Sequence, residues 1–265
     1  MHEDIAGYYD DLAPYYKLMF HDWEASVQRH GAILDGIIRQ YAGERARTVL
    51  DVACGIGTQS LGLAQRGYQV TGSDISPAEI ALAGGEARRR GLAINFQLCD
   101  MRQVWATLQR QFDVVLAFDN AVPHLQNDND ILQAFQQCYQ CTAPDGLCAI
   151  SVRDYAAMEC SGQRIFPRLV HDTPVGRDLL FDLWQFDGDY YDFTTYVVQD
   201  TGGAEAVTRV IRNGRYYCVS VETLTRLFYE AGFAEVIIER ERFFQPVLVA
   251  RKSSSRVIHP PQHTS

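Results

Sequence analysis

Apolar residues along the chain gather in short runs that alternate with longer stretches of helical spacing. The apolar run Thr48–Val52 leads into two glycines, which predicts a buried strand followed by a tight loop. A helix is expected from Thr58 to Gln65. Further strands are expected at Tyr68–Gly72, Ile94–Leu98, Asp113–Phe118 and Leu147–Val152, the last of them after a turn at Pro144-Asp145-Gly146. Further helices are expected at Pro77–Arg90 and Asn129–Thr142. Short connections between alternating strands and helices predict an α/β protein with a doubly wound parallel sheet.

Residues 156–219 interrupt this alternation. They are rich in Tyr, Phe, Trp and Asp, and strand-like runs occur at Leu179–Phe186, Tyr191–Gln199 and Val207–Arg212, which predicts an antiparallel insertion. The α/β pattern then resumes with a helix at Val221–Ala231 and strands near Ala234–Glu239 and Pro246–Ala250. The full prediction is a Rossmann-like, doubly wound, seven-stranded and mostly parallel sheet with an N-terminal helical arm and an antiparallel β insertion.

The charge and the cysteines exclude several classes of function. A formal net charge of −9 argues against non-specific binding to nucleic acids or anionic membranes, and no apolar run approaches the ~18 residues of a membrane span. The seven cysteines are unevenly placed and no signal peptide is apparent, which favours free thiols in a cytoplasmic protein. Cys138 and Cys141 have no second ligand pair at a suitable spacing, so we expect buried thiols and no metal.

The loop Asp51–Gly57 (DVACGIG) carries the first indication of chemistry. Gly55 and Gly57 permit a sharp strand-to-helix turn and a close approach of a ligand. Ser60 occupies the third glycine position of a dinucleotide fingerprint, so the match to an NAD site is imperfect. Asp51 would repel a pyrophosphate, whereas a cationic amino-acid head group or a sulfonium would be tolerated.

Two further acids follow the next two predicted strands. Asp74 at the end of the second strand can accept both hydroxyl hydrogens of a ribose. Asp100 and Met101 after the third strand can bind the amino group of an adenine and pack on its ring. S-adenosylmethionine contains a ribose, an adenine and a cationic head group but no phosphate, so it suits these residues better than NAD does.

At these residues the sequence resembles class I S-adenosylmethionine-dependent methyltransferases. It is similar, more narrowly, to the glycine/sarcosine N-methyltransferase branch, through VLDVACGIG (49–57), DNAVPHL (119–125) and VRDY (152–155). The resemblance implies that Ala53 and Asp74 line the cofactor site, that Arg29 holds the cofactor carboxylate and that His124 lies beside its methionine part. It also implies that Asn120 and Arg153 hold a substrate carboxylate.

These arguments yield two sets of candidate residues. The cofactor set is Tyr9, Arg29, Asp51, Ala53, Gly55, Gly57, Asp74, Ile75, Asp100, Met101, Asp119 and His124, and the catalytic set is Asn120, His124, Arg153 and Tyr155. Tyr9 is included because a tyrosine ring can attract a sulfonium. A bland alternative remains for several of them: Arg153 can pair with Asp154 or Asp119, Asn120 can serve a turn, and His124 can be a core residue. The aromatic residues of the insertion can line a substrate site or form its core.

The candidates divide the chain into five parts. We expect an arm or lid at 1–45, an S-adenosylmethionine-binding core at 46–155, a substrate-binding insertion at 156–219, the completion of the sheet at 220–252 and a disordered tail at 253–265. The amphipathic first helix leaves a homo-oligomer possible.

Methyl transfer to a small molecule is the function that these features favour. The acceptor is expected to be the nitrogen of an amine, amino acid or N-heterocycle, because a neutral amine needs no strong base, only the loss of its extra proton. A phenol or enol would need a base, for which His124, Asp119, His171 and the tyrosines are the candidates. The alternatives are O- or C-methylation of an aromatic metabolite, a nicotinamide-dependent oxidoreductase, which the missing Tyr-x-x-x-Lys pair disfavours, and a non-catalytic domain.

Overall fold

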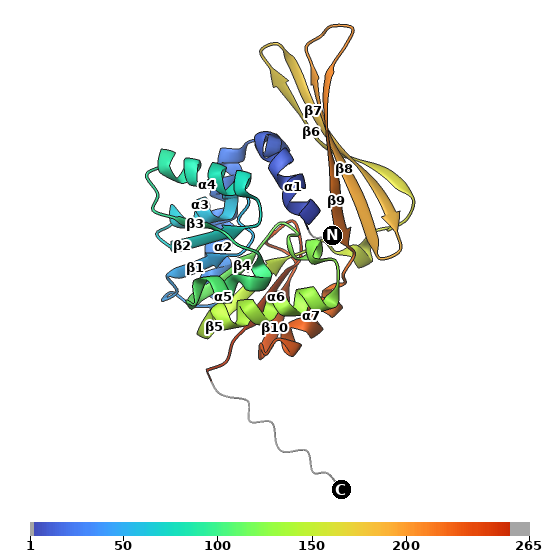
Figure 1. The fold of residues 1–265 in the computed structure, drawn as a ribbon. Coiled ribbons are helices and arrows are strands. Elements are labelled where there is room, and N and C mark those ends of the chain that lie inside the picture. Colours follow the sequence, from blue (N-terminus) through green and yellow to red (C-terminus); the bar gives the residue numbers. More distant parts are fainter. Residues whose placement is uncertain (1–2, 255–265) are drawn as a thin grey trace.

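The computed structural model describes residues 3–254, and its centre is a seven-stranded sheet (Figure 1). The strand order is β10-β11-β5-β4-β1-β2-β3, and β11 alone runs against its neighbours. The strands are β1 (Thr48–Asp51), β2 (Gln69–Asp74), β3 (Asn95–Leu98), β4 (Phe112–Ala117), β5 (Thr142–Ser151), β10 (Glu235–Glu239) and β11 (Val247–Arg251). The predicted fold class is confirmed, and the predicted tail from residue 255 onward lies outside the described residues.

Helices cover both faces of this sheet because its strands are apolar on both sides. In β4, Val114 and Leu116 pack against one group of helices, whereas Val115 and Ala117 pack against the other. The first group includes α2 (Trp23–Tyr41) and α3 (Thr58–Ala64), and the second includes α6 (Asp128–Cys141) and α7 (Val221–Glu230). Two other helices, α4 (Pro77–Arg89) and α5 (Val104–Leu108), complete the windings, together with the short 3₁₀ turns η2 (Met101–Gln103), η3 (Val122–Leu125) and η4 (Tyr155–Ala157).

Helices α2, α4, α6 and α7 begin where the sequence provides a capping side chain. Ser76 Oγ accepts a hydrogen bond from the Glu79 backbone N–H at 3.1 Å, with Pro77 in the first helical position of α4, as predicted. No helix among residues 3–254 is long and apolar enough to cross a bilayer.

The insertion forms a second, four-stranded antiparallel sheet of β6 (Gln163–Thr173), β7 (Gly176–Asp187), β8 (Tyr190–Asp200) and β9 (Val207–Tyr217). Figure 1 shows this sheet extending beyond the rest of the molecule beside α1. The sequence analysis missed β6, because this largely exposed edge strand contains Pro167 and lacks a regular alternation of apolar residues.

One local prediction is corrected by the structure. The Pro144-Asp145-Gly146 turn does not precede the fifth strand but lies within β5 as an irregularity, where the pairing with β4 changes register. Asp145 has a φ of +61°, and a Cβ on Gly146 would lie 2.7 Å from Asp113 O. The chain therefore bulges here to pass close to β4 without leaving the sheet.

The N-terminal arm joins the two sheets. It consists of α1 (Glu3–Leu12) and the 3₁₀ helix η1 (Ala13–Met19). Tyr8 OH lies 2.8 Å from Thr195 Oγ1 on β8, and His171 Nε2 on β6 donates to Leu18 O at 2.8 Å. At its other end, Asp10 Oδ1 accepts from Ser76 Oγ at 2.6 Å, at the start of α4. The arm therefore connects helix α4, which packs beside the central sheet, to the second sheet.

Candidate active site

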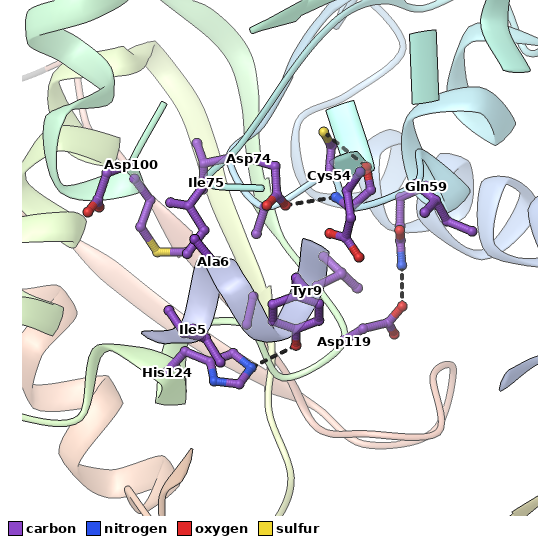
Figure 2. Close-up of a pocket in the computed structure, with 18 of the residues that line it drawn as sticks. Ile5, Ala6, Tyr9, Cys54, Gln59, Asp74, Ile75, Asp100, Asp119 and His124 are labelled. Atoms are coloured by element: carbon purple, nitrogen blue, oxygen red, sulfur yellow. Dashed lines mark hydrogen bonds between the residues drawn. The ribbon is translucent and has the colours of Figure 1, made fainter. Parts of the chain in front are cut away.

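A cavity of about 200 Å³ opens at the carboxyl edge of the central sheet (Figure 2). We call it cavity 1. Its walls come from the ends of β1, β2, β3 and β4 and from α1, the region where ligands bind in open α/β sheets. The predicted cofactor residues on its walls are Tyr9, Ala53, Gly55, Asp74, Ile75, Asp100, Met101, Asp119 and His124.

The glycine loop forms the floor of cavity 1. Gly55 has a φ of +52° and its N–H donates to Asp74 Oδ2 at 2.9 Å. Gly57 has a φ of +92° and caps α3. It does not line the cavity, and a Cβ at this position would lie 3.3 Å from the Leu61 side chain. Gly55 therefore gives a ligand access to the backbone, and Gly57 serves the turn.

Asp51 lies behind this floor and not on the wall of the cavity. It is buried, and Ser60 Oγ donates to its Oδ2 at 2.8 Å. Burial raises the pKa of Asp51 to about 7. The pair links β1 to α3, which explains why a serine occupies the third glycine position. Asp51, which was predicted beside the cofactor, therefore does not line cavity 1.

Asp74 retains acceptor capacity toward the cavity. Its Oδ2 accepts from Gly55 N and its Oδ1 from Ser76 N at 3.0 Å, and each carboxylate oxygen has two acceptor sites. Asp100 is more occupied, because the Arg102 guanidinium grips it with Nε 3.1 Å from Oδ1 and Nη2 2.5 Å from Oδ2. The apolar Ile75 and Met101 side chains line the cavity near these acids.

Glu79 is a cavity residue that the sequence analysis missed. It lies in the first turn of α4, is 2% exposed and has no hydrogen-bond partner for Oε1 among the described residues. Burial raises the pKa of this carboxyl well above its usual value. The Ser-Pro-Ala-Glu sequence at 76–79 is a helix-start signal, which would have located Glu79 at the head of α4.

His124 and Tyr9 close cavity 1 from the side of the arm. The His124 Nδ1–H donates to Arg215 O at 2.9 Å, which leaves Nε2 to accept from Tyr9 OH at 2.7 Å (Figure 2). Burial lowers the pKa of His124 to about 3, so the imidazole is neutral. His124 Nε2 thus holds the arm, and Nδ1 fixes the ring to β9.

A second cavity of about 270 Å³, cavity 2, adjoins the first. Tyr9, Tyr16 and Asp119 line both cavities. The remaining walls of cavity 2 come from α1, the end of η1, α2, the segment after β5, β6, β8, β9 and the chain that precedes β11. The residues are Tyr8, Leu12, Met19, Phe20, Arg29, His30, Arg153, Arg168, Phe193, Tyr216, Phe244 and Gln245.

Arg153 is a cation in cavity 2 without an ionic partner. Its Nη1 donates to Tyr191 OH at 2.5 Å, and the guanidinium lies 5.0 Å from the ring centre of Trp184 and 5.5 Å from that of Tyr216. Within residues 3–254 no carboxylate forms an ion pair with it, and Asp154 pairs with Arg240 instead. The ion pair that competed with a ligand-binding role is therefore absent from the described structure.

Asn120 and Tyr155 support Arg153 from behind. Asn120 is 1% exposed, accepts from the Arg153 backbone N–H at 2.9 Å and donates to Tyr155 OH at 2.8 Å. Neither residue lines a cavity. Arg29 lines cavity 2 rather than cavity 1 and donates to Ser26 Oγ at 3.0 Å. Arg29 thus shares cavity 2 with Tyr9 and Asp119, the two cofactor candidates that line both cavities.

The aromatic residues of the insertion divide into two groups. Trp184 and Tyr191 are core residues of the second sheet, whereas Phe193 and Tyr216 line cavity 2. Arg168, which the sequence analysis did not select, also lines cavity 2 and is held by Asp182 through bonds of 2.8 and 2.6 Å. No sequence motif marks these residues, because only the pairing of the successive strands β6, β7, β8 and β9 brings them to the cavity.

Comparisons with known proteins agree with this arrangement. A family model described as "Methyltransferase domain" matches residues 49–146. The chain is 31% identical over 134 residues to a glycine/sarcosine N-methyltransferase of Parasynechococcus marenigrum, a match that covers 51% of this chain and 46% of that protein. It is 33% identical over 109 residues to a ubiquinone biosynthesis O-methyltransferase of Pseudomonas paraeruginosa, covering 41% and 45%. The chain spans about half the length of these curated relatives.

A solved structure extends the likeness to the whole fold. CalS10, an amino pentose methyltransferase from Micromonospora echinaspora, superimposes with a TM-score of 0.73 at 22% identity, over 86% of this chain and 92% of that one. Residues 49–146 therefore match a methyltransferase domain, and the fold over most of the chain is that of CalS10. The predicted resemblance to glycine/sarcosine N-methyltransferases is confirmed as sequence similarity over half of the chain.

Proposed function

We propose that the protein transfers the methyl group of S-adenosylmethionine to the nitrogen of a small molecule that carries an anionic group. The observation that carries this proposal is the pair of adjoining cavities, which share Tyr9, Tyr16 and Asp119. One has the ribose-type acceptor Asp74, and the other contains the guanidinium of Arg153 without a carboxylate partner among the described residues.

The walls of cavity 1 fit S-adenosylmethionine. Asp74 can accept the ribose hydroxyls, Ile75 and Met101 offer apolar surface to the adenine, and the Gly55 backbone lies open to the amino-acid part. Glu79 Oε1 is buried and has no hydrogen-bond partner among the described residues, and a polar group of the ligand would satisfy it. The bound cofactor supplies a methyl group already activated by a sulfonium.

The residues of the protein then position the acceptor. Holding two reactants in line removes about 7–11 kcal/mol of the barrier to a bimolecular step. Arg153 can bind a carboxylate of the acceptor through two parallel hydrogen bonds, while Asn120 and Tyr155 keep its backbone and surroundings in place. Tyr9, held by neutral His124, covers the junction of the cavities and excludes water.

A second candidate is O-methylation of an aromatic acceptor. It is favoured by Phe193 and Tyr216, whose rings are stacked 4.9 Å apart on the wall of cavity 2. Against it, both nitrogens of His124 are occupied, by Tyr9 OH and Arg215 O, so this imidazole has no free nitrogen to deprotonate a phenol.

Two measurements test the proposal. Calorimetry with S-adenosylmethionine and with NAD should show binding of the first and none of the second. A methyl-transfer assay against matched amines and phenols, with and without a carboxylate, should give N-methylated products of the carboxylate-bearing amines by mass spectrometry. Binding of NAD alone would contradict the methyltransferase function, and products from phenols alone would favour the second candidate.

A further inference from the structure

Asp119 lies where the two cavities meet, directly after β4. Its φ is +58° and that of Asn120 is +66°, conformations that non-glycine residues seldom adopt. The backbone is fixed there by a 2.7 Å hydrogen bond from Asp119 N to Ser151 Oγ, which in turn donates to Gln245 Oε1 at 2.9 Å. Strain maintained in this way at a cavity junction indicates that the direction of the side chain matters.

The two carboxylate oxygens of Asp119 have different surroundings. Oδ2 accepts from Gln59 Nε2 at 2.6 Å, as Figure 2 shows. Oδ1 is shielded from solvent and has no hydrogen-bond partner among the described residues. A buried acceptor without a donor is costly, typically about 1–3 kcal/mol and more for a charged group. At the junction of two ligand cavities, this orphan oxygen indicates a donor supplied by a ligand.

We propose that Asp119 Oδ1 binds the protonated amine of the methyl acceptor and takes its proton before methyl transfer. This inference rests on the proposed function and narrows it to acceptors with a basic primary or secondary amine. An ammonium group satisfies a buried carboxylate both as a hydrogen-bond donor and as a countercharge, which a phenol cannot do.

The step is balanced in protons and electrons. An N–H proton of the ammonium moves to Asp119 Oδ1, which leaves a neutral amine and a protonated carboxyl. The nitrogen lone pair forms the new N–C bond to the methyl carbon, and the C–S bond breaks with its electron pair remaining on sulfur. The product leaves as a methylated ammonium, and the proton on Asp119 passes to water when the cavity opens.

The electrostatic surroundings of Asp119 suit this exchange. Burial raises the pKa of Asp119, while His30 on α2, Gln59 on α3 and Arg153 after β5 lower it. Tyr16 of η1 and Asp51 at the end of β1 also face this carboxylate. Because burial dominates, the carboxylate is a better proton acceptor than an exposed aspartate.

Sinefungin provides a test that does not require the identity of the acceptor, since it carries a primary ammonium on the carbon that replaces the methylated sulfonium. Dissociation constants for sinefungin, S-adenosylmethionine and S-adenosylhomocysteine are measured by calorimetry on wild type, on Asp119→Asn and on the exposed control Glu44→Gln. We expect Asp119→Asn to weaken sinefungin about tenfold or more relative to S-adenosylhomocysteine, and S-adenosylmethionine by less than about threefold. Glu44→Gln should change neither ratio.

Each other outcome has a defined meaning. Failure of wild type to bind S-adenosylhomocysteine would overturn the proposed function itself. An unchanged sinefungin ratio in Asp119→Asn would overturn the role of Asp119 alone, and an equal loss for S-adenosylmethionine would show that only charge is sensed, which also overturns it. If Asp119→Asn does not fold, the same ratio is followed in wild type as pH is lowered. It should fall as the carboxylate is protonated, and a constant ratio would refute the proposal.

Discussion

The two cavities that meet at Asp119 are built in different ways. Cavity 1 takes most of its walls from four strand ends within residues 52–125, each separated from the next by one crossover. Cavity 2 takes its walls from segments as distant as Tyr8, Arg153 and Gln245. The first therefore depends on the local geometry of a parallel sheet, and the second depends on how the arm and the second sheet dock. A substitution in cavity 1 should therefore affect the binding of the cofactor, and a substitution in cavity 2 should affect the binding of the methyl acceptor.

The largest difference in effect between the two cavities is expected from Asp74→Ala, a change in cavity 1. This change removes the acceptor for the ribose hydroxyls and also the partner of Gly55 N and Ser76 N, so the floor of cavity 1 loses both ligand contacts and its own support. Loss of charged hydrogen bonds predicts a dissociation constant for S-adenosylhomocysteine about 100-fold higher. Calorimetry checks this against Glu235→Ala, an exposed acid on β10. Equal affinity in both variants would show that cavity 1 is not the cofactor site.

The opposite difference, an effect on the acceptor and little effect on the cofactor, is expected from Arg153→Met. This change keeps an unbranched side chain but removes the guanidinium. The acceptor KM should rise about 50-fold, because a charge-assisted pair is lost, while the affinity for S-adenosylhomocysteine changes less than about threefold. Steady-state kinetics with the best amine from the assay panel provides the measurement. Arg153→Lys should recover only part of the loss, since an ammonium cannot form the planar two-point contact. Unchanged kinetics in Arg153→Met would remove Arg153 from the acceptor site.

The sequence made cavity 1 predictable because the pattern that defines each strand also defines where it ends. Asp74, Asp100 and Asp119 could be placed at one edge because parallel strands end on the same side. Glycines could be assigned to the loop, although the structure separates Gly55 at the ligand side from Gly57 at the turn.

Cavity 2 could be predicted only in part. Arg153 was found through its motif, but Arg168 and Tyr216 lie on strands whose register sets which side chains face inward, and no local signal gives that register. Arg29 was predicted at the cofactor carboxylate and lies on the wall of cavity 2, and no local pattern in the sequence gives the rotation of α2 that sets this position. Asp51 was predicted beside the cofactor and lies behind the floor of cavity 1, because it pairs with Ser60, and its position in the sequence does not give this burial.

A third prediction concerns the contact that joins the two cavities. Helix α2 carries His30 to cavity 2 and α3 carries Gln59 to cavity 1, and they cross where a Cβ on Gly62 would lie 2.3 Å from Val27 O. Gly62→Ala should therefore lower the free energy of unfolding by about 2 kcal/mol through overpacking. Urea unfolding measures the effect. Gly85→Ala in α4, where the nearest atom is 4.0 Å away at the end of Arg88, should be neutral or stabilising. Equal stabilities would show that the helices do not cross so closely.

The smallest predicted effect is a pH dependence at His124, the residue that ties the arm over the junction. Its pKa is lowered from 6.5 to about 3 by burial, so the unfolded chain binds a proton below pH 6.5 that the folded chain does not. Stability from this residue is therefore present above that pH and is lost as pH falls, by about 1 kcal/mol between about pH 7 and about pH 5.5.

Comparison with His124→Asn isolates this contribution, because the amide can still donate to Arg215 O while the other titrating groups are common to both proteins. The advantage of wild type in urea unfolding should shrink by that amount over the interval. A constant advantage would mean that the imidazole is open to water, so that the Tyr9–His124 contact does not close the junction. In that case both cavities would be exposed to solvent. The different effects of Asp74→Ala on the cofactor and of Arg153→Met on the acceptor would then arise from direct contacts alone, without the exclusion of water.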